Sequence, residues 1–592
     1  MRFPKINLVT ANKIWHILSS SEKRTAVFLL GLMMIGMVLE TLGIGLVIPA
    51  IALFAEGDIS GNYPALQSLL NSLGNPNHKT LVIWGLSLLL AVYIVKNLFL
   101  AFLVWRQTRF AHMVGAQLSQ NLFSVYLRQP YTFHLQYNSA LLLRNVYNEV
   151  NVFMGAIQAF MLMLMESLVL FALCTMLVVI EPLSALVVII VIGFSAGGFY
   201  FFSRKQIKHW GEARLYHEGL RIQHLQQGLG GVKDVILLGR ENDFIDEYSL
   251  HNTKSARIAQ MVTTLKQMPK LWLEVLAVGG LVSMVLTMLM QGRPLESVLP
   301  IIGFFAVAAF RLMPSANRIL GAIQTVRFDL PVINTLYEEL QLPVLNTGSK
   351  NAARGTIESS LELNHVSFLY EGSTEAVIND MSIRIERGES VGLIGLSGAG
   401  KSTLVDIILG LLIPTKGTVC VDSKNINENL RSWQDQLGYV PQSIYLTDDT
   451  LRRNVAFGLT NEAIDDEAVM KAIRAAQLED FIRELPDGLN TQVGERGVRL
   501  SGGQRQRIGI ARALYHDPAV LVLDEATSSL DVATEAVVME AIQALHGEKT
   551  IIIVAHRLST VENCDRIYKL EKGLIIDEGS PEQILRTAEV KS

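Results

Sequence analysis

The sequence predicts an α-helical transmembrane domain of six spans, followed by an α/β domain. The chain has 592 residues, 50% of them hydrophobic, and its mean hydropathy of +0.32 is high for a soluble protein. The apolar residues are concentrated before about residue 340, whereas charged and apolar residues alternate in the remainder. We therefore predict a transmembrane domain over 1–340, a polar linker over 341–355 and a second domain over 356–592.

Six apolar segments are predicted to be membrane-spanning helices. At about 1.5 Å per residue the first would reach roughly 45 Å, which exceeds a hydrocarbon core of about 30 Å and is too long for a signal peptide. The predicted spans are 25–55, 79–105, 153–180, 183–202, 271–290 and 298–313. The stretches 107–152 and 203–270 are polar but helical in pattern, so we expect them to continue the spans beyond the membrane.

The basic residues of the first domain predict its orientation. Lys23 and Arg24 precede the first span, and further Lys and Arg, among them Arg106 and Arg204, crowd the even-numbered connections. The opposite loops are poor in Lys and Arg. Because cytoplasmic loops carry the excess of positive charge, both termini and the second domain are predicted to be cytoplasmic.

A phosphate-binding pattern opens the second domain. An apolar run from Val391 leads into Gly395-Leu-Ser-Gly-Ala-Gly-Lys401-Ser402, and a helical pattern follows. In this form of loop, backbone N–H groups surround the β- and γ-phosphates, the lysine adds positive charge and the serine hydroxyl reaches Mg²⁺. The apolar run, the loop and the helical pattern meet the strand–loop–helix requirement of such a site.

Together with Leu500-Ser-Gly-Gly-Gln504 and an apolar strand that ends in Asp524-Glu525, this loop resembles the ATP-binding cassette (ABC) family. The resemblance implies an ATPase that binds ATP and Mg²⁺. The residues that it assigns to the nucleotide are Tyr370, Gly395, Ser397, Gly398, Ala399, Gly400, Lys401, Ser402, Thr403, Ser501, Gly502, Gly503, Gln504 and Asp531. Tyr370 would stack on adenine, although an aromatic residue of the sheet is the alternative.

The resemblance also assigns the metal ligands and the hydrolytic groups. Ser402, Gln442 and Asp524 would hold Mg²⁺, since hydroxyl, amide and carboxylate oxygens suit that ion. Glu525 would orient the attacking water, His556 would hold the γ-phosphate and the base in place, and Gln442 would be the third catalytic residue. Short transverse helices that touch the ATP-binding domains are implied at 131–137 and 228–240.

Ionisable residues inside the predicted spans are the candidates for substrate binding. Charges in a bilayer are costly, so they usually face protein, a cavity or a partner. Glu40 and Lys96 both fall near the midplane, where we expect an ion pair, with a transport role as the alternative. Arg311 and Arg318 lie in the inner half, where they either extend to the headgroups or line, with Lys96, a cavity for an anionic head group.

An amphipathic helix is predicted between the first two spans. Its leucines recur at helical spacing, among them Leu66, Leu69 and Leu70, with polar residues opposite. It either caps the helix ends or lies in the outer leaflet and meets a lipid substrate.

Within the ABC exporters the chain resembles bacterial lipid-linked oligosaccharide flippases. This likeness rests on 40–49, 64–73, 269–274 and 311–315. It implies an inner-membrane homodimer that uses ATP to move a polyprenyl-diphosphate oligosaccharide to the outer leaflet, as in protein glycosylation. A lipid A or multidrug exporter is the alternative.

Composition argues against several other classes of protein. The net charge of −4 gives no basic footprint for nucleic acid, and six predicted spans argue against the soluble ABC ATPases of DNA repair. The three cysteines, Cys174, Cys420 and Cys564, are scattered, so no disulfide framework or zinc site is expected.

Overall fold

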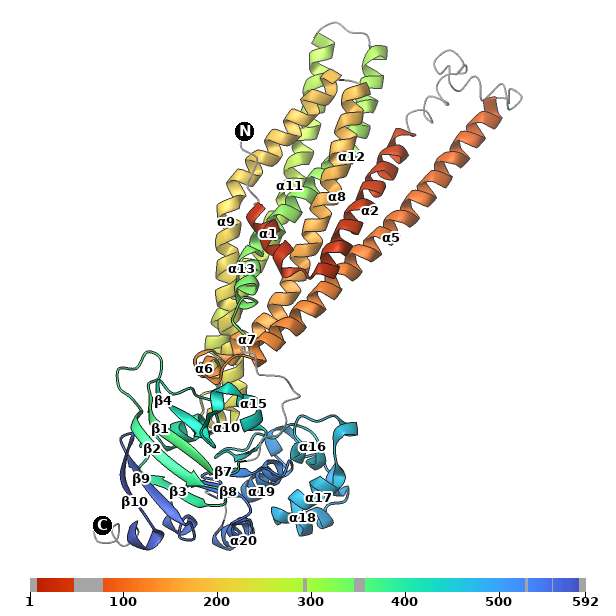
Figure 1. The fold of residues 1–592 in the computed structure, drawn as a ribbon. Coiled ribbons are helices and arrows are strands. Elements are labelled where there is room, and N and C mark those ends of the chain that lie inside the picture. The colour runs from red at the N-terminus through yellow and green to blue at the C-terminus, as the bar shows by residue number, and fades with distance from the viewer. Residues whose placement is uncertain are drawn as a thin grey trace. The chain divides into compact units, whose positions relative to one another are not determined.

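The computed structural model describes residues 8–46, 78–180, 182–290, 295–344, 357–527, 531–555 and 557–584 (Figure 1). The chain divides into two compact units. The first comprises 1–129 and 136–344, and the second comprises 130–135 and 345–592. The main division thus falls within the predicted linker, and the short segment 130–135 groups with the second unit. Predictions for Leu66, Leu69, Leu70 and His556 lie outside the described residues.

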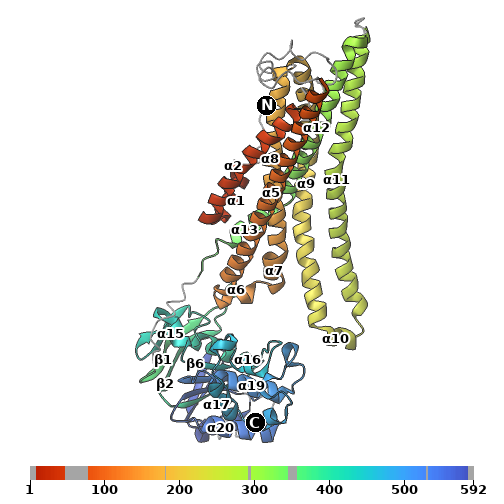
Figure 2. The same ribbon diagram turned by 90° about the vertical axis from the view of Figure 1, so that its right-hand side faces the viewer.

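The first unit is helical, and its long helices run side by side (Figures 1 and 2). The helices up to the linker are α1 (Leu8–Ile17), α2 (Ser20–Gly45), α5 (His78–Leu127), α6 (Tyr131–Gln136), α7 (Ser139–Arg144), the π-helix η1 (Asn145–Glu149), α8 (Val150–Ile180), α9 (Pro182–Gly230), α10 (Val232–Leu237), α11 (Glu241–Met290), α12 (Leu295–Phe328) and α13 (Leu330–Glu339). Helix α2 begins with a capping box, in which Ser19 Oγ accepts from the Glu22 backbone N–H at 3.3 Å and the Glu22 carboxylate accepts from that of Ser19 at 2.7 Å.

The polar stretches that were predicted to extend the spans are largely helical. Helices α5, α9 and α11 continue without a break through much of the polar stretches, and the short helices α6 and α10 stand where transverse helices were expected. Each of the six predicted spans falls largely on a long helix. Within the described residues, however, only Ser20–Gly45, Val82–Leu127 and Ser139–Val179 are long and apolar enough to cross a membrane, so the number of spans stays a prediction.

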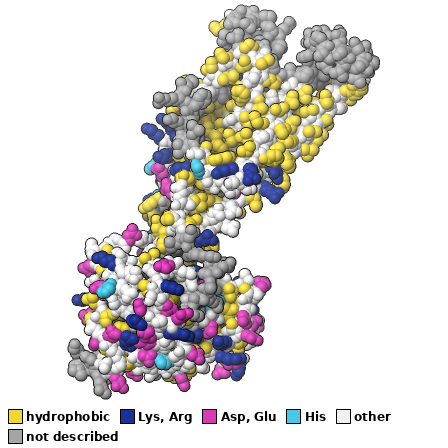
Figure 3. Space-filling view, in the orientation of Figure 1, with side chains coloured by type: hydrophobic (Ala, Val, Ile, Leu, Met, Phe, Trp, Pro, Cys, Tyr) yellow, Lys and Arg dark blue, Asp and Glu magenta, His cyan; other side chains and the backbone are white. Residues whose placement is uncertain are grey.

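The surface of the first unit explains why its sequence is so apolar. Large hydrophobic side chains such as Phe171, Phe194 and Phe202 are more than 70% exposed. Figure 3 shows hydrophobic side chains covering much of the long helices, with Lys and Arg gathered in a band across them. In water such a surface would be unfavourable, whereas lipid chains solvate it without cost.

The second unit is an α/β domain with two sheets, in the strand orders β2-β1-β4-β5 and β10-β9-β3-β8-β7-β6. Its strands are β1 (Ser360–Phe368), β2 (Ile378–Glu386), β3 (Ser390–Gly395), β4 (Lys416–Val421), β5 (Lys424–Asn425), β6 (Leu437–Val440), β7 (Val520–Asp524), β8 (Thr550–Val554), β9 (Arg566–Glu571) and β10 (Leu574–Gly579). Strands β9, β3, β8, β7 and β6 are parallel, so their carboxyl ends meet at one edge. Strand β10 joins β9 in antiparallel fashion.

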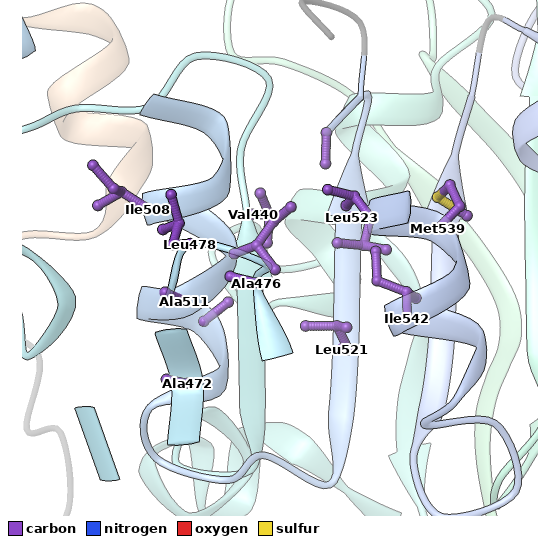
Figure 4. Packing of buried hydrophobic residues seen from close by; sticks show 14 of the residues in the cluster. Val440, Ala472, Ala476, Leu478, Ile508, Ala511, Leu521, Leu523, Met539 and Ile542 are labelled. Carbon is purple, nitrogen blue, oxygen red and sulfur yellow. The ribbon is translucent and has the colours of Figure 1, made fainter. Parts of the chain in front are cut away.

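The helices of this unit cover the sheets. They are α14 (Lys401–Ile408), α15 (Leu430–Gln434), α16 (Leu451–Val455), α17 (Asp466–Ala475), α18 (Glu479–Glu484), α19 (Gly502–Leu514) and α20 (Val532–Gln543), with short 3₁₀ turns η2 (Ile426–Glu428), η3 (Asn461–Ala463), η4 (Gly488–Asn490), η5 (Glu495–Gly497) and η6 (Leu558–Thr560). Figure 4 shows part of the core, where Leu521 and Leu523 of β7 lie between Met539 of α20 and Ile508 of α19. Strands β7 and β8 are fully buried, which fixes the loops at their ends.

Candidate nucleotide-binding site and charge cluster

The predicted phosphate loop connects the buried strand β3 to the N-terminus of α14. Gly398 and Gly400 have φ values of 81° and 99°, which residues with a side chain rarely adopt. A Cβ atom on Gly400 would also lie 2.9 Å from Ile378 Cδ1. The glycines therefore let the backbone curl tightly before α14, whose first N–H groups have no partner within the helix and suit an anion.

Lys401 lies inside this loop. Its ammonium donates to the carbonyl oxygens of Gly395 at 2.9 Å and Leu396 at 3.2 Å, and the residue is only 6% exposed. Burial lowers the pKa of Lys401, whereas the nearby Glu525 and Asp524 raise it. The cation is thus held over the loop, where a β- or γ-phosphate would replace the carbonyl contacts.

Gln442 and Glu525 are both predicted to be catalytic residues, and the structure brings them into contact. Both follow neighbouring parallel strands, β6 and β7, and Gln442 Nε2 donates to Glu525 Oε2 at 2.7 Å. Glu525 has a positive φ of 50°, and Gln506 Nε2 of α19 reaches its carbonyl oxygen at 3.5 Å. Glu525 thus combines a strained backbone with a carboxylate that a neighbouring side chain orients. Strained backbone conformations cluster at functional sites.

The predicted Mg²⁺ ligands fit the ion by their chemistry. Ser402 is exposed at the start of α14, Asp524 ends β7, and the amide oxygen of Gln442 is left over when its nitrogen bonds Glu525. Within the described residues no group of three or more His, Cys, Asp or Glu could hold a metal ion. A site with one carboxylate agrees with that finding, since Mg²⁺ is usually bound by one or two carboxylates plus substrate phosphates and water.

Two groups next to Asp524 were not predicted from the sequence. Burial, followed by the charge of Asp524, raises the pKa of Asp406 to about 6. Burial, the charges of Asp524 and Asp406, and a hydrogen bond to Asp524 raise the pKa of Tyr439. The available signal was helical spacing, because Asp406 follows Ser402 by four residues and therefore lies on the same face of α14.

Tyr370 lies beside the phosphate loop. Its hydroxyl is 3.2 Å from Thr403 Oγ1, and its ring meets that of Phe368 edge to face, with 4.9 Å between the centroids. The ring is half-buried directly after β1, which keeps it near the start of α14. This position is compatible with stacking on a base, and that role stays a prediction.

The predicted nucleotide-binding segment 500–504, called the signature segment below, forms the N-terminus of α19. Ser501 Oγ accepts from the Gln504 backbone N–H at 3.2 Å, and Gln504 Oε1 accepts from that of Ser501 at 2.8 Å. Ser501 is exposed, and Gly502 and Gly503 follow it as the first residues of the helix. Each side chain thus satisfies the backbone N–H of the other residue, and the remaining N–H groups of the helix terminus are left to an incoming phosphate.

Asp531 lies just before α20, and its carbonyl oxygen accepts from the Glu535 backbone N–H at 2.8 Å. The buried Glu535, which the sequence analysis missed, holds three segments together. Its carboxylate accepts from Thr527 at 2.9 Å, Arg557 at 2.8 Å and Thr560 at 3.0 Å. Glu535 therefore ties α20 to Thr527, which follows β7, and to the segment that comes directly after the predicted site residue His556.

In the first unit, Glu40 pairs with two cations. Its carboxylate lies 3.8 Å from Lys96 Nζ and bonds the Arg311 guanidinium, and the side chains of Glu40 and Lys96 are less than 10% exposed. The expected Glu40–Lys96 pair is confirmed. Arg311 has a carboxylate partner that was not predicted, and so does Arg318, which pairs with Glu166.

Comparison with known proteins places these sites in context. The family described as ABC transporter transmembrane region matches residues 64–292, and the family described as ABC transporter matches residues 378–528. A Bacillus subtilis protein named "Putative multidrug export ATP-binding/permease protein YgaD" is 37% identical over 277 residues, which are 46% of this chain and 47% of that protein. A Staphylococcus aureus protein with the same name, apart from its final symbol, is 41% identical over 229 residues, which are 38% and 39% of the two chains.

The chain thus matches about half, or less, of the length of these curated relatives. A solved structure, described as that of a bacterial Atm1-family ABC exporter with ATP bound, has a TM-score of 0.79 over 96% of both chains at 23% identity, which shows that the fold is shared. The two family matches together cover more than half of the sequence. The first lies almost wholly within the first unit, and the second lies within the second unit. The chain therefore belongs to the ABC transporter family, as a half-transporter that joins an exporter-type transmembrane domain and an ATP-binding domain in one polypeptide.

Proposed function

We propose that the protein hydrolyses ATP to export an anionic amphiphile from the inner leaflet of a bacterial cytoplasmic membrane. The observation that carries this proposal is the cluster of Glu40, Lys96 and Arg311, in which one carboxylate faces two cations. When all three groups are ionised, the cluster carries one net positive charge inside the predicted spans. A buried charge of that kind is costly unless an anion or water meets it, and the fork of Arg311 suits a phosphate oxygen pair.

The geometry of the second unit supports the hydrolytic half of the proposal. Bound Mg²⁺ and ATP would supply the scissile γ-phosphoryl group and its charge neutralisation. Lys401 would bind the phosphates, Glu525 would orient the attacking water, and Gln442 would hold the Glu525 carboxylate in position through the 2.7 Å hydrogen bond. We place this unit and both termini in the cytoplasm.

Among anionic amphiphiles, a polyprenyl-diphosphate oligosaccharide is the substrate that the sequence resemblance suggests. A diphosphate would meet Arg311 and Lys96, while Arg318 has its own partner in Glu166. The curated relatives are named for multidrug export instead, so a drug-like amphiphile is the second candidate. The excess positive charge of the cluster favours an anionic compound over a cationic one.

Two substitutions change the charge of this cluster in opposite directions and so test the proposal. Arg311→Gln makes the cluster neutral, and Glu40→Gln raises its charge to two. Transport would be measured in proteoliposomes with a labelled polyprenyl-diphosphate oligosaccharide and with a fluorescent cationic drug. We expect Arg311→Gln to reduce transport of the diphosphate lipid at least tenfold, while Glu40→Gln retains it.

Thermal unfolding in detergent controls for damage to the fold. The second candidate would be favoured if the unmodified protein transports the drug faster than the diphosphate lipid and if Arg311→Gln increases drug transport. If Arg311→Gln and Glu40→Gln lose transport of the diphosphate lipid equally while their thermal stability is unchanged, the cluster serves conformational change rather than anion binding. That result would overturn the proposal.

A further inference from the structure

A groove in the first unit shares no lining residue with the charge cluster of Glu40, Lys96 and Arg311. It has a volume of about 650 Å³, within the range of pockets that hold a drug-sized ligand. Four helices contribute to its wall, and the lining is almost wholly apolar. It includes Trp15 of α1, Leu30 and Met33 of α2, Phe110 of α5 and Met161 of α8.

The groove starts at the basic end of α2. Lys23 and Arg24 lie near the start of this helix. Lys23 Nζ is 5.8 Å from the centroid of the Trp15 ring, which lines the groove. On α5, Arg106 lies one helical turn before Phe110 and 5.9 Å from the ring centroid of Phe28. The cations therefore lie beside the apolar wall.

In the part of the chain that the structure describes, no carboxylate pairs with Lys23, Arg24, Arg106 or Arg109. Lys23, Arg106 and Arg109 instead lie over aromatic rings. The nearest acidic residue along α2, Glu22, already accepts from the Ser19 backbone N–H. Positive charge at the groove is thus left available to a ligand.

The depth of the groove matches one leaflet. From Lys23 to Met33 the helix rises by roughly 15 Å at its usual rise per residue. This is about half of a hydrocarbon core of about 30 Å. An occupant with its charge at Lys23 would therefore extend an apolar chain to the bilayer midplane.

We infer that this groove binds an anionic phospholipid of the inner leaflet, with its phosphate at Lys23 and Arg24 and one acyl chain along Leu30 and Met33. Charge complementarity selects this occupant, because basic pockets between helices on the cytoplasmic side bind acidic head groups. A zwitterionic lipid would place its own cation next to these arginines and lysines. The inference depends on the membrane location of this unit and is independent of the exported substrate.

Native mass spectrometry of the purified, delipidated full-length chain tests the inference. The protein would be titrated with phosphatidylglycerol or with phosphatidylcholine of the same chains. We expect one tightly retained phosphatidylglycerol per chain, an affinity at least tenfold lower for phosphatidylcholine, and a similar loss in a Lys23→Gln/Arg24→Gln variant. A photoactivatable phosphatidylglycerol should label peptides that contain Met33 or Met161.

A matched control is Arg204→Gln/Lys205→Gln, which removes two neighbouring charges from α9 at positions that do not line the groove. This variant should retain the tightly bound lipid. The inference is wrong if both lipids bind equally, if both double variants lose binding equally, or if the photoprobe labels only other helices. Cross-links from groove residues to a second copy of the chain, in place of lipid, would assign the groove to a subunit interface and overturn it as well.

Discussion

Glu525 is the residue on which hydrolysis should depend most. Gln442 orients its carboxylate, and its backbone adopts a positive φ directly after β7. A general base contributes about 10²–10⁴-fold to a rate, so Glu525→Gln should lower kcat by that amount while ATP still binds. Steady-state ATPase measurements and equilibrium nucleotide binding on the same preparation would separate the two effects.

Glu467→Gln is a suitable control for that experiment, because Glu467 is an exposed carboxylate on α17. It should leave both measurements unchanged. Near-normal turnover of Glu525→Gln would show that another group positions the water.

Among single residues, the sequence allowed prediction of those that belong to a contiguous motif. Residues that only the fold brings together were missed. Lys401 and Glu525 could be assigned because the chemistry requires them at fixed places after buried strands. Glu535 is 25 residues from Thr560 along the chain, so nothing local shows that their side chains meet. The partner of Arg311 was missed for the same reason, since Glu40 lies 271 residues away.

Among the elements, the π-helix η1 joins α7 to α8 and carries a completely buried Glu149. Its carboxylate lies 2.7 Å from Arg214 and 3.6 Å from Arg144. Removing one member of a buried ion pair leaves an uncompensated charge and usually costs about 3–5 kcal/mol. Glu149→Gln should therefore lower the thermal unfolding temperature of the purified protein by several degrees.

The matched control is Glu212→Gln on α9, which breaks the exposed 3.5 Å pair with Lys208. A surface pair contributes about 0–1 kcal/mol, so the unfolding temperature should hardly move. Equal effects of the two substitutions would show that the pairing around η1 adds no particular stability.

Helices α9 and α11 meet at a cluster of histidines that should make their packing sensitive to pH. His217 Nδ1 lies 3.0 Å from His251 Nδ1, and the ring of His224 stacks on that of His251 at 5.3 Å. Burial first, and then the nearby Lys254, lower the pKa of His217. Burial, the other two histidines and Lys254 lower the pKa of His251, and Glu247 opposes them.

A histidine with a lowered pKa binds protons less readily in the folded than in the unfolded protein. Its neutral form therefore favours folding above the unfolded pKa of about 6.5, and the advantage is lost as the pH falls below that value. We expect the unfolding temperature to fall between pH 7.5 and pH 5.5, and to fall less in His217→Gln/His251→Gln. An identical decline in both proteins would contradict this account.

The predictability of the elements depended on hydrophobic contrast. Helices were predicted well where apolar residues run on for many turns or recur at helical spacing, as in α2 and α8. The strand order could not be predicted, because β3 pairs with β8 and β9, which follow it by more than 150 residues. The π-helix has no sequence signal of its own, and the partner of its Glu149 is Arg214 of α9, which lies 65 residues further along the chain.

For the whole molecule, composition and the phosphate loop predicted a helical domain followed by an α/β domain, and both are shown. The number of spans depends on hydropathy alone, since part of the apolar sequence lies outside the described residues. Under the proposed function the substrate would be set by a few side chains from helices that are far apart in the sequence, which is why it is the least predictable property.

The last prediction concerns assembly of two copies of the chain. Each chain has one phosphate loop and one signature segment, and Ser501 lies exposed at the N-terminus of α19 with its side chain bound to Gln504. Family resemblance implies that the phosphate loop of one chain and the signature of another enclose each ATP, in a two-fold homodimer. Native mass spectrometry in detergent should accordingly report a dimer.

Mixing two inactive variants would test this composite site directly. Lys401→Ala damages the phosphate loop and Ser501→Arg damages the signature, so either homodimer should have no intact site. A mixed dimer would keep one intact site, which joins the phosphate loop of the Ser501→Arg chain to the signature of the Lys401→Ala chain. If the sites act independently, equal co-expression should restore about one quarter of the normal ATPase activity, because random pairing gives about half mixed dimers. If each chain instead built its site from its own phosphate loop and signature segment, every site in the mixture would be damaged and no ATPase activity would return. A fully active monomer would likewise exclude the shared site.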